Sequence, residues 1–160
     1  MNPIAWLVGL VLPACGAVGA AGLPTPQPMD MAAIVRPSSP NTALAAPAGF
    51  KPTPDIVTQP YHVAPLRLFA AIRAVAQAQP RVFVAAVYPD RLQVHYVVRS
   101  AVFNFPDLVT VAIDPVGDDT ATLTIYSRSV YGHSDLGVNR ARIETWLQAL
   151  QTELHQDHGR

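Results

Sequence analysis

The distribution of proline most constrains what this chain can fold into. Nine of its sixteen prolines lie between Pro24 and Pro60, among Ala, Ser and Thr and without a sustained helical or strand period. Because proline fixes φ and lacks a backbone donor, such a stretch favours extended polyproline II structure. We therefore expect residues 24–60 to form a Pro/Ala-rich linker and the folded domain to follow it.

The N-terminus is apolar, since Ile4 to Leu23 carries no charge over twenty residues. As a helix this run would span about 30 Å, the thickness of a bilayer's hydrocarbon core. Residues 1–23 therefore fit a transmembrane anchor, a cleaved secretory signal, or a lipoprotein signal in which Cys15 is the lipidated residue. A buried helix of the folded domain is a fourth interpretation, with no role in targeting. No Lys or Arg precedes the run, which weakens every export interpretation. We expect the N-terminus to direct the chain to a membrane or the cell envelope.

Charge and cysteine content exclude several classes of function. Eleven basic and eleven acidic residues cancel, so no net field attracts nucleic acid or an acidic membrane. Cys15 is the only cysteine, which rules out an intramolecular disulfide and a cysteine-based zinc site. The sequence has no phosphate-loop or G-x-S-x-G motif, and His155 and His158 lie in a C-terminus expected to fray. We expect no cofactor and no metal site.

Residues 61–155 carry the periodic patterns of a domain, and residues 156–160 are expected to be a disordered tail. Pro65 occupies a typical first helical position, and a helical stripe follows it until Pro80. Four strand-like segments come next, at Arg81 to Tyr88, Arg91 to Phe103, Leu108 to Ile113 and Thr120 to Val130. A last helix carries one apolar stripe, made of Ile143, Trp146, Leu147, Leu150 and Leu154.

This order, α-β-β-β-β-α, predicts an α+β fold behind the apolar N-terminal segment. Short connections favour a four-stranded antiparallel sheet with both helices on one face. The second strand alternates, with Val94 and Tyr96 facing one way and Gln93, His95 and Arg99 the other. We therefore expect the other face of the sheet to be open to water.

The densest polar segment joins the fourth strand to the last helix. It contains the candidate residues of an anion site, which are Ser127, Arg128, Ser129, Ser134, Asp135, Asn139 and Arg140. In one interpretation the helix N–H groups, serines, Asn and Arg bind a carboxylate or phosphate. In the other, which we favour, Ser134 or Asp135 caps the helix and Arg128 or Arg140 pairs with Asp135. Consecutive His133, Ser134 and Asp135 cannot form a catalytic triad, because their side chains diverge.

The same segment carries a family resemblance. Ser127 to Ile143 matches a pattern S-x-S-x-x-G-x-S-D-L-G-x-N-R-x-R-[IV], which resembles the signature of the domain of unknown function 1499 family of bacteria and plants. His62 to Leu66 is similar to that family's domain start, and Phe105 to Val109 lies where members carry an acidic stretch. The resemblance covers about residues 36–150. It implies no particular activity, because the family has none that is settled.

The chain departs from the family pattern before the domain. Many members resemble C-P-x-S-P-N-C there, whereas this chain reads Arg36-Pro37-Ser38-Ser39-Pro40-Asn41-Thr42. Any joint role of the two cysteines cannot operate here. The retained Ser-Pro-Asn predicts that this segment docks against the domain.

Two classes of function remain. The first is a binding or scaffold module tethered at a membrane or exported to the cell envelope, with an unidentified protein or small anionic ligand as its partner. The second is a small hydrolase or transferase with an arginine/serine anion pocket at the start of the last helix. The two differ in whether Ser127, Arg128, Asn139 and Arg140 converge on a cleft or form caps and surface pairs.

Overall fold

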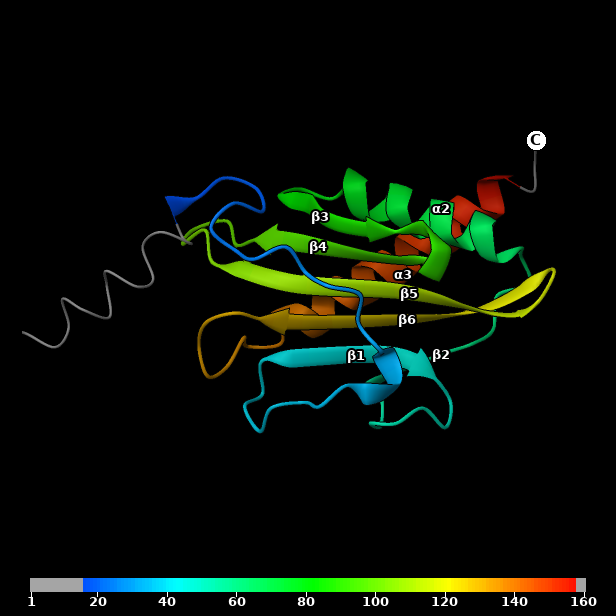
Figure 1. Cartoon of the computed structure of the whole chain (residues 1–160), viewed down its shortest axis with the longest axis horizontal. Helices are drawn as coiled ribbons and strands as arrows, with labels where there is room; N and C mark the ends of the chain where they lie inside the picture. The colour runs from blue at the N-terminus through cyan, green and yellow to red at the C-terminus, as the bar shows by residue number, and fades with distance from the viewer. Residues whose placement is uncertain (1–15, 158–160) are drawn as a thin grey trace, which may run out of the picture.

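A six-stranded mixed sheet with two helices on one face forms the framework of the protein (Figure 1). The computed structural model describes residues 16–157. The strand order is β2-β1-β6-β5-β4-β3, in which only β1 and β2 pair in parallel. The elements are η1 (Met31–Ala33), β1 (Thr42–Pro47), β2 (Ile56–Thr58), α2 (Pro65–Ala78), β3 (Val82–Tyr88), η2 (Pro89–Arg91), β4 (Gln93–Arg99), β5 (Pro106–Gly117), β6 (Thr120–Ser129) and α3 (Val138–Asp157).

The prediction of a four-stranded antiparallel sheet is wrong, although the α+β class holds. Strands β3 to β6 are the four predicted segments, joined as an antiparallel meander. Strands β1 and β2 come from residues 42–47 and 56–58, inside the segment expected to be a linker. Prolines flank these strands without interrupting them, since Pro40 precedes β1, Pro47 ends it, and Pro52 and Pro54 lie between β1 and β2. The free edge of β6 gives β1 an antiparallel partner, and this pairing outweighs the local preference for polyproline II.

The main core lies between the sheet and the helices. Helix α2 begins at Pro65, where the missing N–H has no intrahelical partner to lose, and it buries Leu68, Phe69 and Ile72. Helix α3 buries Trp146, whose ring meets Tyr96 of β4 edge to face at 5.6 Å. Both helices therefore pack on the same face of the sheet. The predicted stripe of α3 is confirmed, whereas the predicted stripe of α2 is wrong at Leu66, which is 72% exposed.

The opposite face is not open to water, so that prediction is also wrong. Gln93, His95 and Arg99 are at most 4% exposed. The chain before β1 runs across this face, over β4, β5 and β6 (Figure 1). Gln93 fixes it by accepting from the Met29 backbone N–H at 2.7 Å and donating to the Met29 carbonyl at 2.8 Å. Arg99 donates to the Gly19 carbonyl at 3.0 Å and to the Ala21 carbonyl at 2.9 Å.

A second apolar cluster forms where this N-terminal segment crosses the sheet. Met31 and Ile34 of the segment contribute to it, and the sheet supplies Leu44, Ala46, Ala112 and Tyr126. Both faces of β1 are consequently buried, because Ala43 and Ala45 pack into the main core.

Two of the sequence predictions concern the two ends of the chain. Residues 1–15, including the candidate lipidation residue Cys15, lie outside the described residues. Helix α3 continues through Gln156 to Asp157, so these two residues are helical rather than part of a disordered tail, and residues 158–160 lie outside the description. Within residues 16–157, no helix is long and apolar enough to span a membrane.

Candidate functional site

The loop between β6 and α3 is organised by one carboxylate. Asp135 accepts from the backbone N–H of Gly137 at 3.0 Å and of Asn139 at 2.8 Å. Gly132 and Gly137 have φ of +91° and +83°, which a residue with a side chain would adopt only with strain. Ser134 accepts from the Leu136 N–H at 3.3 Å. The predicted cap is therefore observed, and Asp135 occupies the helix start that an external anion would need.

Asn139 joins this loop to two other parts of the chain. Its side chain is fully buried, and its Oδ1 accepts from Ser127 Oγ and from Arg142 Nη1. Its Nδ2 donates to the Asn41 carbonyl at 3.0 Å and to Ser129 Oγ at 3.1 Å. Every polar atom of the Asn139 side chain is thus used within the protein.

Asn41 completes the connection from the side of the N-terminal segment. Its Nδ2 donates to the Gly132 carbonyl at 2.8 Å, and its Oδ1 accepts from Ser39 Oγ at 3.0 Å. The Ser-Pro-Asn segment therefore docks on the β6–α3 loop, as its sequence predicts. Arg36 and Thr42 occupy the two cysteine positions of the pattern C-P-x-S-P-N-C. A hydrogen bond joins them, from Arg36 Nε to Thr42 Oγ1 at 3.1 Å.

Arg142 is the central arginine of this network, and sequence reasoning missed it. It donates to Ser127 Oγ at 2.8 Å and forms an ion pair with Asp107, in which each side chain is 10% exposed. Two signals were available. Arg142 follows Asn139 by three residues and so shares its helix face, and Asp107 lies in the stretch compared with the acidic segment of the family.

The two predicted arginines lie elsewhere. Arg140 is exposed and pairs with Glu144 at 3.0 Å on the same helix, rather than with Asp135. Arg128 is exposed on the opposite face of the sheet from Ser127. The seven predicted residues therefore do not converge on one cleft. Ser127, Ser129 and Asn139 meet in the buried network, while Ser134 and Asp135 form the capping turn.

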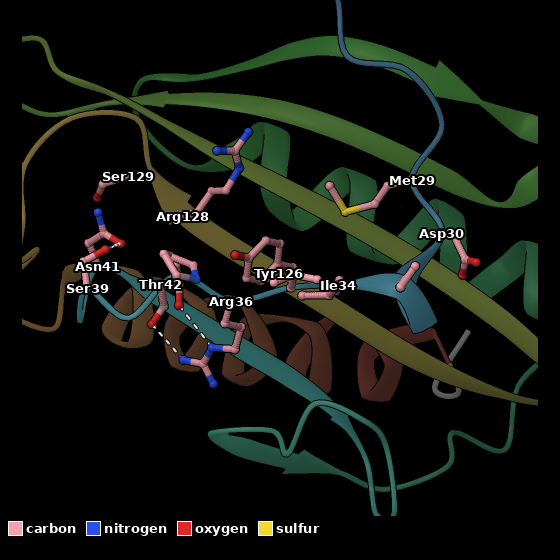
Figure 2. A pocket seen from close by; sticks show the side chains of 13 residues that line it. Met29, Asp30, Ile34, Arg36, Ser39, Asn41, Thr42, Tyr126, Arg128 and Ser129 are labelled. Atoms are coloured by element: carbon pink, nitrogen blue, oxygen red, sulfur yellow. Dashed lines mark hydrogen bonds between the residues drawn. The ribbon is translucent and has the colours of Figure 1, made fainter.

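A pocket of about 530 Å³ lies on the other side of β6, beneath the chain that leads into β1 (Figure 2). Two of the predicted residues, Arg128 and Ser129, line it. The full lining is Met29, Asp30, Ala33, Ile34, Val35, Arg36, Pro37, Ser39, Asn41, Thr42, Tyr126, Arg128 and Ser129.

The two arginines of the pocket differ in how they are used. Arg36 donates to Thr42 and forms an ion pair with Asp55 at 2.8 Å. Arg128 extends from β6 on the other side of Tyr126, as Figure 2 shows. Within residues 16–157 its guanidinium forms no hydrogen bond and no ion pair. Burial raises the pKa of Tyr126, while the nearby Arg128 and Arg36 and a hydrogen bond with the Thr42 side chain lower it in part. The Tyr126 phenol therefore stays neutral and can donate a hydrogen bond at pH 7.

The remaining polar groups of the pocket are engaged within the protein. The Asp30 carboxylate caps η1 by accepting from the Ala32 N–H at 3.0 Å. Ser39 donates to Asn41, and Ser129 accepts from Asn139. No histidine or glutamate lines this pocket, and residues 16–157 contain no group of three or more metal-ligating side chains.

The fold and this pocket together define a small α+β domain with a ligand-sized, arginine-bearing pocket. A family model described as "Protein of unknown function (DUF1499)" matches residues 34–150, and the chain belongs to that family. The match begins at Ile34, within the lining of the pocket, so the family domain includes β1, β2 and the chain that leads into β1.

The fold is also found in a solved structure. The crystal structure of protein MLL2253 from Mesorhizobium loti superposes with a TM-score of 0.50 at 14% sequence identity, covering 72% of this chain and 97% of that chain. At this identity the likeness concerns the fold alone. No curated protein matches the chain.

Proposed function

We propose that this domain is a binding module whose pocket over β6 holds a small ligand with one anionic group and an apolar body. The observation that carries the proposal is Arg128, a guanidinium at the pocket with no hydrogen bond or ion pair within residues 16–157. A guanidinium binds carboxylates and phosphates through two parallel N–H groups. Arg36 adds little net charge, because Asp55 is its ion-pair partner.

The rest of the lining supports the apolar half of this ligand. Met29, Ile34, Val35 and Pro37 contribute apolar surface from the N-terminal segment. Ligand pockets commonly combine such a lining with a few polar groups that fix orientation. The neutral Tyr126 hydroxyl supplies one such group on the floor of the pocket.

Binding is favoured over hydrolysis or group transfer, the second class that the sequence left open. Nucleophilic catalysis needs a hydroxyl or thiol beside a general base. The hydroxyls of Ser39 and Ser129 contact the side-chain amides of Asn41 and Asn139, which are not bases. The lining therefore offers recognition groups without an activated nucleophile.

We further infer that the N-terminus holds the module at a membrane or carries it to the cell envelope. The support is the apolar sequence that begins at Ile4 and carries no charge. Because Arg99 holds the Gly19 and Ala21 carbonyls against the sheet, the inference concerns the part of this sequence that precedes Gly16. A vesicle flotation assay with the full chain tests this inference. Recovery of the chain in the bottom fraction would contradict retention at a membrane.

Isothermal titration calorimetry with phenyl phosphate, benzoate and the neutral benzyl alcohol tests the binding proposal. The two anions should bind and benzyl alcohol should bind at least about tenfold more weakly, because a hydrogen bond to a charged group contributes roughly 1.5–3 kcal/mol. Arg128→Gln should weaken anion binding about 10- to 100-fold. Arg140→Gln is the matched control, since this second predicted arginine lies outside the pocket. Equal losses in both variants, or no preference for anions, would contradict the proposal.

A further inference from the structure

Exposed apolar side chains gather at one end of the sheet. Strand β4 ends there, β5 begins, and the loop between them carries Val102 and Phe103, which are 82% and 68% exposed. Phe103 stacks on Phe105 with ring centroids 5.5 Å apart, and Tyr131 lies 6.5 Å from Phe105. In the β6–α3 loop at the same end, Leu136 is 94% exposed. We call Val102, Phe103, Phe105, Tyr131 and Leu136 the end patch.

Acidic side chains at this end are already neutralised or engaged. Asp107 pairs with Arg142, and Asp135 caps α3. The opposite end differs, because its turns carry the exposed carboxylates of Asp90, Asp118 and Asp119. The end patch therefore meets an apolar or anionic surface with less electrostatic cost than the opposite end does.

The apolar N-terminal run enters the described structure beside this patch. The Ala17 carbonyl accepts from Asn104 Nδ2 at 3.0 Å, and the Gly19 carbonyl accepts from Arg99 Nε at 3.0 Å. Both donors belong to the end of β4 or to the β4–β5 loop. Val18, between these two anchored residues, is itself 82% exposed. The uncharged run from Ile4 to Leu23 therefore contacts the β4–β5 loop directly, through Ala17.

We propose that the end patch docks on the surface of the bilayer that receives the N-terminal run, with Val102 and Phe103 inserted among the lipid headgroups. Aromatic and aliphatic side chains are stable at that depth because their rings and methyl groups leave water. A chain anchored beside the loop raises the local concentration of the loop at the bilayer, so shallow insertion needs little affinity of its own. The proposal rests on the membrane attachment inferred above and adds an orientation, with the β4–β5 loop toward the lipid and the β5–β6 turn away from it.

Site-specific fluorescence in the full chain tests this orientation. Cys15→Ser removes the native thiol, and Val102→Cys then accepts an environment-sensitive NBD label. Val116→Cys is the matched control, because it is a valine of similar exposure, 66%, at the opposite end of β5. Vesicles of phosphatidylcholine and phosphatidylglycerol carry a nitroxide quencher near the headgroup. The label at position 102 should shift to shorter wavelength and be quenched on vesicles, while the label at position 116 should change in neither respect.

The outcomes separate this proposal from the attachment on which it rests. Flotation with vesicles but no quenching at position 102 would overturn docking of the end patch and leave the attachment standing. Absence of flotation in the wild-type chain, which keeps Cys15, would overturn both. A blue-shifted label at position 102 without lipid would mean that protein, either the N-terminal run or a second copy, covers the patch, and this would also overturn the proposal. Loss of quenching in Phe103→Ser/Phe105→Ser, with flotation retained, would support it.

Discussion

Asn139→Ala should be among the most destabilising single substitutions in the polar part of this domain. The asparagine is fully buried and makes side-chain hydrogen bonds to Ser127, Arg142, Asn41 and Ser129. Some of these partners retain other hydrogen bonds in the variant. Arg142 still donates to Ser127 and pairs with Asp107, and the Asn41 carbonyl still accepts from the Ser129 N–H at 3.0 Å. The Ser127 hydroxyl proton, however, loses its acceptor in a buried site.

The magnitude follows from these losses. One stranded buried donor costs about 1–3 kcal/mol, and the weakened contacts and small cavity add roughly 1 kcal/mol. We expect a loss of about 2–4 kcal/mol in the free energy of unfolding, or roughly 6–16 °C in Tm for a domain of this size.

Urea and thermal unfolding of both Asn139→Ala and Arg140→Ala provide the assay. The Arg140 side chain is exposed, and its replacement removes only an exposed ion pair with Glu144. Arg140→Ala should therefore lower the free energy of unfolding by about 0.5 kcal/mol or less. The reasoning would be refuted if Asn139→Ala cost under about 1 kcal/mol, or no more than the Arg140 control.

Substitutions at three further residues test separate parts of the structure. Asp135→Ala should destabilise the domain by about 1–2 kcal/mol because two N–H groups at the start of α3 lose their acceptor, whereas Asp135→Asn should cost less; equal melting of all three proteins would argue against the cap. Burial lowers the pKa of His95, so the folded state disfavours its protonated form. Stability should therefore fall as pH drops below about 6.5 toward the folded pKa, and His95→Gln should remove that part of the pH dependence in thermal melts; an unchanged profile would contradict it. Gln93→Ala should speed amide hydrogen exchange at Met29, whose N–H it binds, and unchanged exchange there would show that the N-terminal segment is held by other contacts.

The parts of the fold that the sequence predicts are those with a clear period. Strand β4 alternates between residues that face the helices and residues that face the N-terminal segment, and α3 repeats apolar residues at helical spacing. Strand β1 has no such signal, because both of its faces are buried. Ala43 and Ala45 face the helices while Leu44 and Ala46 face Met31 and Ile34, so apolar residues run on without alternation.

The prolines around this segment favour a linker when the local sequence is considered alone. Residues 42–47 form a strand because they pair with the free edge of β6, which lies more than seventy residues later in the chain: Thr42 pairs with Arg128 and Ala45 with Ile125. The buried state of Gln93 and His95 has the same origin. Their alternation is correct, but the segment that covers them carries no pattern that points to the sheet.

The candidate site shows a similar division between local and distant signals. The Asp135 cap follows from local spacing, and the structure contains it. Arg128 and Arg140 carry the same charge in the sequence, yet strand geometry sends Arg128 to the face away from Ser127. The pocket beside Arg128 exists only because residues 29–42 fold over β6. Its other arginine, Arg36, could not be assigned to a site before that contact was known.

Amide chemical-shift mapping during a titration with phenyl phosphate tests the central claim most directly, since it locates the anion rather than only detecting it. The proposed function predicts shift changes at residues that line the pocket, such as Ile34, Thr42 and Ser129, and their loss in Arg128→Gln. Changes confined to the start of α3, around residues 135–140, would instead assign the anion to the capping turn. That result, or shifts that persist unchanged in Arg128→Gln, would contradict the proposed binding site.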